Sequence, residues 1–250
     1  MKITGNTVLI TGGATGIGLG LAAAFLKEGN EVLICGRRKS KLKEAQAELP
    51  GLHTVACDVS NEKGRKYLFD WVTSNFGNVN ILINNAGIQK TIDFTKGPVQ
   101  LLEGESEVDI NLNAPIYLSA RFIPLLSERK EAAIVNVSSQ LAFAPLAFIP
   151  VYCATKAALH SFTLSLRHQL KKTSIKVFEI IPPRVDTDLG KGTREDKGHM
   201  PAAIPAGQVV ETAMDALKRD KFEIIVGTAN DLIPKFRNNP DELFKIMNGS

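Results

Sequence analysis

Cysteine and histidine are scarce in this chain of 250 residues, and a long apolar run is absent. The three Cys lie far apart and the four His show no paired ligand spacing, so we expect neither a disulfide framework nor a metal site. No apolar run reaches the roughly 18 residues of a membrane-spanning helix. These absences argue against disulfide-rich, metal-binding and membrane proteins.

Neither positive nor negative charge is concentrated in one part of the chain. Thirty Lys and Arg stand against 26 Asp and Glu, a net charge of +4, and the two signs are interspersed. Nucleic acid is therefore not an expected partner. Residues 1–6 lead almost at once into a strand pattern, without the layout of a signal peptide. We expect a cytoplasmic protein.

Hydrophobic residues make up 44% of the chain and no Pro-, Gly- or Ser-rich linker divides it, which predicts one domain over residues 1–250. Seven apolar runs of strand length alternate with longer amphipathic stretches: Thr7–Thr11, Glu31–Cys35, Thr54–Cys57, Asn80–Asn84, Ala132–Val137, Lys176–Ile181 and Glu223–Val226. Near-continuous apolar strands separated by helix-length segments indicate a parallel sheet covered on both faces. The prediction is a doubly wound α/β Rossmann fold, a seven-stranded parallel sheet flanked by helices, with ligands beyond the carboxyl ends of the strands.

A glycine-rich turn at residues 11–18 follows the first predicted strand. Gly12 permits a tight turn, Gly16 lets the backbone approach a pyrophosphate, and Gly18 lets the next helix pack on the strand. The N–H groups expected to face the anion belong to Ala14, Thr15 and Ile17. Such a turn can also be a plain connection, but its place in a βαβ unit favours dinucleotide binding.

The end of the second predicted strand carries Arg37 and Arg38, where an NAD enzyme usually has an acidic residue for the ribose 2′-hydroxyl. Two guanidinium groups suit a 2′-phosphate instead, which favours NADP(H) over NAD(H). The alternative is a solvated basic turn. Asp58 and Val59 end the third predicted strand and are expected to contact adenine; helix capping by Asp58 or Ser60 is the alternative.

Tyr152 and Lys156 stand four residues apart in a predicted helix, so the phenol and the ammonium share one face. A nearby cation lowers the pKa of a phenol, because it favours tyrosinate. The pair therefore suits acid/base chemistry at a carbonyl group. The same spacing also arises by accident in amphipathic helices.

With the glycine turn, Asn84-Asn-Ala-Gly87, Asn111, Ser139 and the Tyr152/Lys156 pair in this order, the chain resembles the short-chain dehydrogenase/reductase family over nearly its whole length. Residues 84–90, 150–158 and 166–170 look like the bacterial DltE-type branch of that family.

The resemblance implies roles for four catalytic residues. Tyr152 is the acid/base, Lys156 lowers the pKa of Tyr152 and binds the nicotinamide ribose, and Ser139 orients the carbonyl. Asn111 holds a proton-relay water through its backbone, rather than being a plain polar helix residue. Ser138 is expected on the opposite face of its strand from Ser139.

The resemblance also implies further cofactor contacts. Asn85, Ala86 and Gly87 lie beside the adenosine ribose, and Val185 and Thr187 meet the carboxamide. Pro183 replaces the Gly of the family's turn at this point, and because proline has no N–H the turn must differ locally.

The substrate end is expected between Ser139 and Tyr152, where an apolar wall is formed by Leu141, Phe143, Leu146, Phe148 and Ile149. These side chains could equally pack in the core or at a subunit interface. A polar segment, residues 188–205, is expected to form a substrate lid, with His199 as a candidate substrate contact.

These features predict an NADP(H)-dependent oxidoreductase that interconverts a small carbonyl compound and its alcohol. A non-catalytic dinucleotide-sensing or scaffold protein should have lost Tyr152, Lys156 or Ser139, and none is lost. A sugar-nucleotide epimerase would need a longer C-terminal region. The resemblance further implies a homodimer or homotetramer that pairs through helices around residues 105–128 and 152–171.

Overall fold

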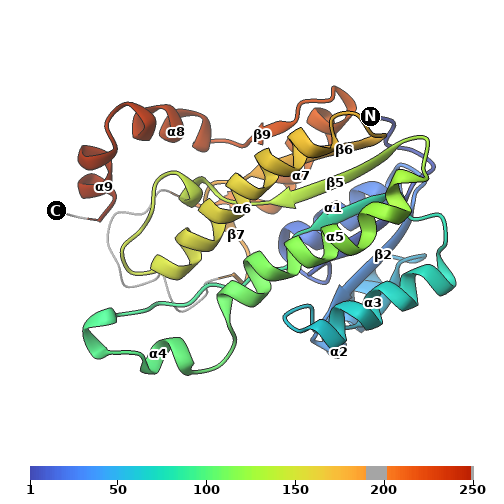
Figure 1. The fold of residues 1–250 in the computed structure, drawn as a ribbon, viewed down its shortest axis with the longest axis horizontal. Coiled ribbons are helices and arrows are strands. Elements are labelled where there is room, and N and C mark those ends of the chain that lie inside the picture. The colour runs from blue at the N-terminus through green and yellow to red at the C-terminus, as the bar shows by residue number, and fades with distance from the viewer. Residues whose placement is uncertain (190–201, 249–250) are drawn as a thin grey trace.

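A computed structural model describes residues 1–189 and 202–248. Its main feature is a seven-stranded parallel sheet in the order β3-β2-β1-β4-β5-β6-β9 (Figure 1). The strands are β1 (Thr7–Thr11), β2 (Glu31–Gly36), β3 (His53–Ala56), β4 (Ile81–Asn84), β5 (Ala132–Val137), β6 (Ile175–Ile181) and β9 (Glu223–Ile225). The predicted α/β fold is confirmed, and the predicted strands agree with these bounds to within one residue.

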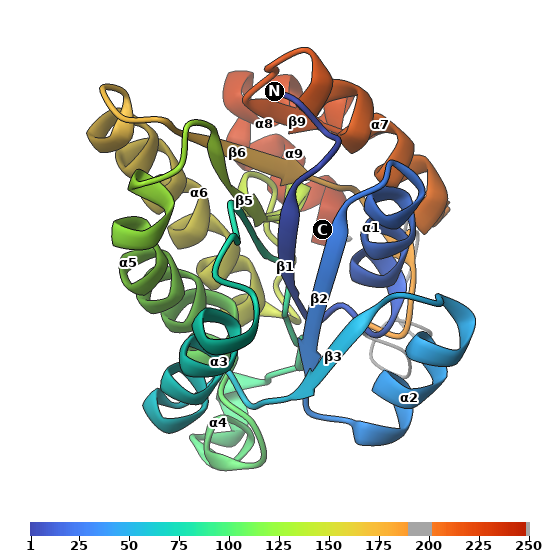
Figure 2. The same cartoon turned by 90° about the vertical axis from the view of Figure 1, so that its right-hand side faces the viewer.

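Two layers of helices cover the sheet, one on each face (Figure 2). The first face carries α1 (Gly16–Lys27), α2 (Lys39–Glu48) and α7 (Ala206–Lys218). The second carries α3 (Glu62–Asn75), α5 (Ala114–Ser127) and α6 (Pro150–Leu170). None of the helices in the described ranges is long and apolar enough to cross a membrane.

The strands read as continuous apolar runs because both faces are buried. In β1, Val8 and Ile10 point into the cluster under α1, whereas Leu9 points into the cluster under α3 and α5. All three side chains are 0% exposed. The pleat of the strand thus divides one apolar run between two cores.

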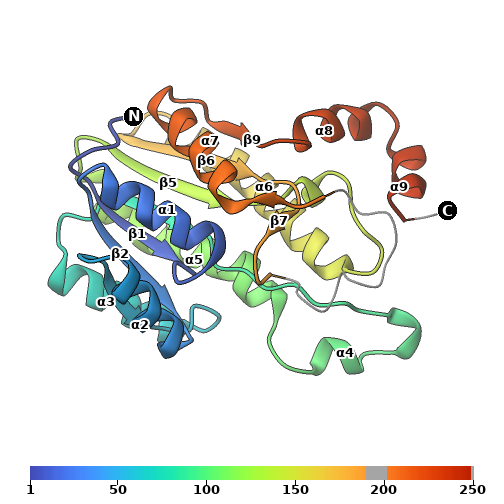
Figure 3. The same ribbon diagram turned by 180° about the vertical axis from the view of Figure 1, so that it is seen from behind.

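Shorter elements lie mainly beyond the carboxyl ends of the strands. In Figure 1 the arrowhead of β5 points toward the side where α4 (Val99–Leu102) and α9 (Pro240–Asn248) lie. The chain reaches α9 through α8 (Ala229–Asn238), and both helices extend beyond the sheet in Figure 3. A small parallel pair, β7 (Val185–Asp186) and β8 (Ile204–Pro205), was not predicted. It pairs the segment just before the predicted lid with the last residues of the lid. Residues 190–201 of the lid, His199 among them, lie outside the described residues.

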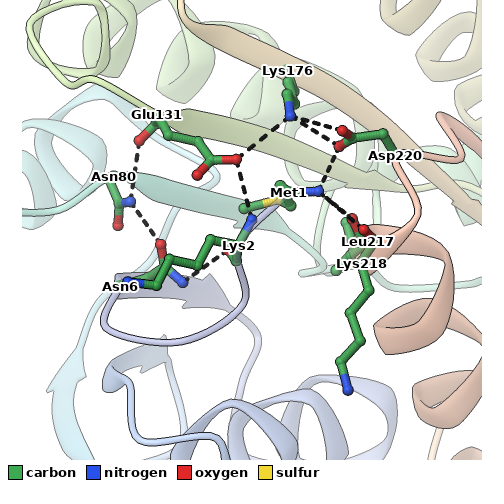
Figure 4. A network of polar contacts seen from close by, with 9 residues as sticks. All are labelled: Met1, Lys2, Asn6, Asn80, Glu131, Lys176, Leu217, Lys218 and Asp220. Atoms are coloured by element: carbon green, nitrogen blue, oxygen red, sulfur yellow. Dashed lines mark hydrogen bonds and ion pairs between the residues drawn. The ribbon is translucent and has the colours of Figure 1, made fainter.

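A polar network lies at the opposite end of the strands, on the amino-terminal side of the sheet (Figure 4). The ammonium group of Met1 donates to the backbone oxygen of Leu217 at 2.7 Å and to the carboxylate of Asp220 at 2.6 Å. Lys176 reaches Asp220 at 2.9 Å and Glu131 at 3.5 Å. These contacts join the amino-terminal ends of the strands, on the side away from the cleft described next.

Candidate active site

A cleft of about 500 Å³ opens at the carboxyl ends of the strands. Seventeen of the 19 predicted cofactor and catalytic positions line it: Gly12, Ala14, Thr15, Gly16, Ile17, Arg37, Arg38, Asp58, Val59, Asn85, Ala86, Gly87, Ser139, Tyr152, Lys156, Val185 and Thr187. Gly18 and Asn111 are the predicted residues that do not line it. The fold thus brings together segments that are far apart in the sequence.

The glycine-rich loop adopts the conformation that its glycines permit. Gly12 and Gly16 have φ values of 64° and 56°, in the left-handed region that favours glycine. Gly18 serves packing instead, because a Cβ atom there would lie 2.4 Å from the backbone oxygen of Gly12 and 2.5 Å from Nδ2 of Asn85. The loop is therefore held close to β1 and leaves its backbone at the cleft.

Thr11, which the sequence interpretation did not select, connects the start of the glycine-rich loop to the segment after β4. Its hydroxyl oxygen accepts hydrogen bonds from the backbone N–H groups of Asn85 and Ala86 at 3.0 and 3.1 Å. The Asn85 side chain in turn donates to the backbone oxygens of Thr11 and Gly12, both at 3.0 Å. The signal available in the sequence was a threonine as the last residue of a buried strand.

The basic end of the cleft follows β2. Arg37 forms an ion pair with Glu105, which the sequence interpretation also missed. The guanidinium of Arg38 lies 3.5 Å from the hydroxyl of Thr15, beside the glycine-rich loop. Both arginines line the cleft, so two cations stand at the place predicted for a 2′-phosphate.

Asp58 and Val59 also line the cleft, and the carboxylate of Asp58 accepts from the backbone N–H of Ser60 at 3.0 Å. The alternative that Asp58 or Ser60 caps α3 was wrong. The N-cap is Asn61, whose side chain accepts from the N–H of Gly64 at 2.8 Å.

Tyr152 and Lys156 lie in the first two turns of α6, which begins with a proline in its first turn. Both side chains are buried, and Nζ of Lys156 lies 5.6 Å from the centre of the Tyr152 ring. Nζ donates to the backbone oxygen of Val137 at 2.9 Å. Burial lowers the pKa of Lys156 to about 8, while the negative charge of Glu179 acts in the opposite direction.

Both serines at the end of β5 line the cleft, so the pleat does not remove Ser138 from it. The hydroxyl of Ser138 lies 3.4 Å from the backbone oxygen of Ile180 on β6. Oγ of Ser139 accepts from the N–H of Leu141 at 3.1 Å. The Ser139 hydroxyl proton is therefore available for an acceptor in the cleft.

Asn111 lies in a π-helical turn, Asp109–Asn113, and is 0% exposed. Its side chain accepts from the N–H of Ile88 and donates to the oxygen of Ile88, both at 2.9 Å, and lies 3.2 Å from the hydroxyl of Thr155 on α6. It is thus no plain polar helix residue. The side chain fixes the segment after β4 next to Lys156; a Cβ atom on Gly87 would lie 3.7 Å from Nζ of Lys156.

The turn after β6 brings Thr187 against the glycine-rich loop. A Cβ atom on Gly16 would lie 2.9 Å from Cγ2 of Thr187. Pro183 lines the cleft in a trans conformation, since none of the described peptide bonds is cis. The local change at Pro183 thus leaves Val185 and Thr187 at the cleft.

The apolar end of the cleft differs in part from the predicted wall. Leu141 and Leu146 line it, and they pack in one cluster with Ile149, Tyr152 and Cys153. Phe148 and Ile149 belong to this cluster but do not line the cleft. Phe143 points elsewhere: it packs against Ile181, Ala229 and Ile233 and meets the ring of His160 at 4.6 Å.

Two residues from distant parts of the chain complete the apolar end. Leu189, after β7, and Met247, on α9, line the cleft and pack against the cluster of Leu141 and Leu146. Asn248 fixes α9 there, because its side chain bonds the backbone N–H of Ala147 at 2.6 Å. The sequence interpretation missed Met247, since nothing local connects it with the cleft.

A metal ion has no evident place in the described part of the chain, where no three His, Cys, Asp or Glu side chains gather in a suitable group. The side chains of Cys35, Cys57 and Cys153 are buried and form no disulfide bond. Burial raises the pKa of Cys35 above its usual range and that of Cys57 to about 11, so both remain protonated thiols at neutral pH.

Comparison with known proteins agrees with this geometry. Residues 6–198 match short chain dehydrogenases, and the chain is 50% identical over 248 residues to the oxidoreductase DltE of Bacillus subtilis, covering 99% of this chain and 98% of that protein. A short chain dehydrogenase from Burkholderia cenocepacia in complex with NADP has a TM-score of 0.81 at 24% identity, over 99% of both chains. A short chain dehydrogenase/reductase from Burkholderia phymatum in complex with NAD has a TM-score of 0.84 at 20% identity, over 97% of this chain and 96% of that one.

Together with the family match, the fold and the cleft identify an oxidoreductase with a Rossmann nucleotide-binding fold. The chain belongs to the short-chain dehydrogenase/reductase family, and its similarity to DltE confirms the predicted family and branch. Members of this family bind NAD or NADP and act on small molecules.

Proposed function

We propose that the protein is an NADP(H)-dependent oxidoreductase that interconverts a carbonyl compound and its alcohol, with Tyr152 as the acid/base. The observation that supports this most strongly is the position of Ser139, Tyr152 and Lys156. Each is at most 5% exposed, and all three line the cleft that also holds the glycine-rich loop. Such a site keeps the reacting groups away from bulk water.

The chemistry assigned to the chain is proton transfer and orientation. Tyr152 gives its proton to the carbonyl oxygen in reduction and takes it back in oxidation. The Lys156 ammonium favours the tyrosinate form, and the Ser139 hydroxyl donates to the carbonyl oxygen as charge develops there. When bound, NADP(H) supplies or accepts the hydride.

The residues at the other end of the cleft fit this cofactor. Close contact between Gly12, Gly18 and the segment after β4 leaves backbone N–H groups at the start of α1 for a pyrophosphate. Arg37 and Arg38 suit a 2′-phosphate, and the residues at the end of β2 and directly after it, Gly36 to Lys39, include no Asp or Glu of the kind that binds the ribose in NAD enzymes. This supports NADP(H) as the cofactor, with NAD(H) as the alternative.

The apolar end favours a substrate with a hydrophobic group beside the reacting carbon. Leu141, Leu146, Leu189 and Met247 give this end of the cleft an aliphatic surface. Discrimination by such surfaces comes in steps of about 1–3 kcal/mol per methylene-sized difference. The enzyme should therefore rank a homologous series of aldehydes gradually.

The test is a reductase screen with NADPH over aldehydes, quinones, keto esters and keto steroids. Oxidation of NADPH that depends on the added carbonyl compound is the expected result, with apolar compounds turned over best. A folded protein that binds NADPH but reduces none of these would favour the second candidate, a dinucleotide-sensing protein. A clear preference for small charged substrates would contradict the assignment of the apolar end.

A homodimer or homotetramer that pairs through α5 and α6 is part of this proposal. Tyr117 on α5 and Leu164 on α6 support it, because these apolar side chains are 52% and 44% exposed. Light scattering after size-exclusion chromatography distinguishes these assemblies from a monomer.

A further inference from the structure

A buried ionisable pair joins β6 to α6, outside the residues assigned to the reaction. The carboxylate of Glu179 is 0% exposed, and Nδ1 of His160 lies 2.9 and 3.1 Å from its two oxygens. Because an ionised carboxylate only accepts hydrogen bonds, Nδ1 carries the proton in this contact. A fully buried glutamate in an apolar strand is costly unless a partner stabilises it.

The pair stands next to Lys156. Tyr152, Lys156 and His160 follow one another at intervals of four residues on α6, so their side chains share one face. Nζ of Lys156 donates to the backbone oxygen of Val137 on β5. The preceding residue on β5, Asn136, is paired in register with Glu179 on β6. The lysine and the carboxylate therefore meet the same part of β5 and β6.

Electrostatics agrees with this placement. Burial disfavours the ammonium form of Lys156 and lowers its pKa to about 8, whereas the negative charge of Glu179 favours that form. Without Glu179, its charge would no longer offset the effect of burial on the pKa of Lys156.

Other charged side chains on the surrounding elements are placed differently. Glu223, the register partner of Glu179 on β9, is partly exposed. Arg167 on α6 donates to two backbone oxygens, and Arg237 on α8 stands over the ring of Phe143. Asp109 in the π-helical turn accepts from the side chain of Asn113.

We propose that Glu179 and His160 are positioning residues for the Tyr152/Lys156 pair: the hydrogen bond from His160 holds the Glu179 carboxylate in place, and the charge of the carboxylate stabilises the Lys156 ammonium. This inference rests on the proposed function, because a protonated Lys156 matters through Tyr152 and the nicotinamide ribose. As a consequence of this arrangement, the Lys156 ammonium should persist to a higher pH.

The test follows the titration of Lys156 directly, by NMR of protein labelled with ¹³C at the lysine side chains. The resonance is assigned by its loss in Lys156→Met. In Glu179→Gln, which keeps the shape and removes the charge, the midpoint should move to lower pH by on the order of one unit. Glu223→Gln removes the same charge one strand away and should leave the midpoint unchanged. An unchanged midpoint in folded Glu179→Gln overturns the proposal.

Two substitutions of His160 keep the proposal testable if Glu179→Gln does not fold. His160→Leu removes the hydrogen-bond donor that holds the Glu179 carboxylate in place, so the carboxylate should stabilise the Lys156 ammonium less and the Lys156 midpoint should fall. His160→Gln still offers an N–H donor, so the Lys156 midpoint in this variant should lie closer to that of the unsubstituted protein. Equal midpoints in the two variants overturn the proposal.

Turnover separates this inference from the proposed function. The alkaline limb of kcat/KM for carbonyl reduction should shift in the same direction as the Lys156 midpoint in Glu179→Gln. If the midpoint moves but the unsubstituted protein reduces no carbonyl compound, the electrostatic inference stands and the proposed function fails. If turnover is present and the midpoint stays, only the role of Glu179 and His160 fails.

Discussion

Asn85 donates two hydrogen bonds to Thr11, each 3.0 Å long: its backbone N–H donates to the Thr11 hydroxyl, and its side chain donates to the Thr11 backbone oxygen. The end of β1, where the glycine-rich loop starts, is thereby fixed to the end of β4. The geometry of the cofactor end thus depends on a contact between two strands as well as on the glycines.

Replacing Thr11 by Val should therefore lower both the affinity for NADPH and the stability of the fold. The variant leaves the N–H groups of Asn85 and Ala86 without their acceptor, which costs about 1–3 kcal/mol in the free energy of unfolding. Thr11→Ser keeps the hydroxyl and is the control. Urea denaturation and NADPH titration measure the two effects; a Val variant that equals the Ser variant in both would refute the role of the hydroxyl.

Gly18 and Gly207 form a matched pair for testing the packing of the loop. A Cβ atom on Gly18 meets the backbone of Gly12 at 2.4 Å, whereas nothing lies within 4 Å of one on Gly207. Gly18→Ala should lower the affinity for NADPH at least about tenfold, since the backbone must shift at the start of α1. Gly207→Ala, in α7, should keep the affinity and raise stability by up to about 1 kcal/mol. Calorimetry and thermal melting compare the two; equal NADPH affinities would contradict the packing role of Gly18.

Cofactor preference should depend on Arg37, Arg38 and Glu105. Replacing both arginines by Ala should weaken NADPH binding roughly ten- to a hundredfold and leave NADH binding nearly unchanged, because NADH has no 2′-phosphate. Glu105→Gln should tighten NADPH binding, because it removes the anion that pairs with Arg37. Titration of both cofactors decides this. Equal affinities of the unsubstituted protein for NADPH and NADH would refute the assignment.

Lys156→Met should destroy activity and yet stabilise the fold at neutral pH. The pKa of Lys156 falls from 10.5 to about 8 on folding, so below pH 8 the folded protein bears the cost of a buried ammonium, roughly 3 kcal/mol. Between about pH 8 and 10.5 the unfolded chain binds more protons than the folded one, so this cost shrinks as pH rises.

The free energy of unfolding should consequently rise by about 1–3 kcal/mol in Lys156→Met at pH 7, after allowance for the lost hydrogen bond to Val137. The gain should shrink as pH approaches 10.5. Denaturation curves at several pH values measure it, and the unsubstituted protein is the control. A variant that is less stable than this control at pH 7 would contradict the electrostatic account of Lys156.

Local patterns in the sequence predicted most of the fold and the ends of the cleft. Parallel strands that are buried on both faces appear in the sequence as continuous apolar runs. Gly12 and Gly16 adopt positive φ values, a conformation that favours glycine and can therefore be predicted from the residue type. Tyr152 and Lys156 are close in space because they are close on one helix. Such features need no knowledge of the rest of the chain.

Contacts between distant segments could not be predicted in this way. The side chain of Asn111 acts on Ile88, 23 residues away, and Met247 reaches the cleft only because α9 returns to the segment after β5. The contact between His160 and Glu179 has no local signal either, because Glu179 lies 19 positions further along the chain, on a strand. Of the two alternatives for Phe143, the structure shows packing in the core: the residue follows a 3-10 turn over Gln140–Ala142 and packs against a separate cluster.

The proposed role of Tyr152 is to transfer the proton to the carbonyl oxygen. It is tested most directly by kcat/KM for NADPH-dependent reduction in Tyr152→Phe, measured with the best substrate of the screen and beside the NADPH affinity of the same variant. We predict a loss of turnover of at least about 10²-fold with NADPH binding nearly unchanged, because the ring remains and the proton is gone. A Phe variant that retains most of its activity would mean that another group donates the proton, and it would contradict the account.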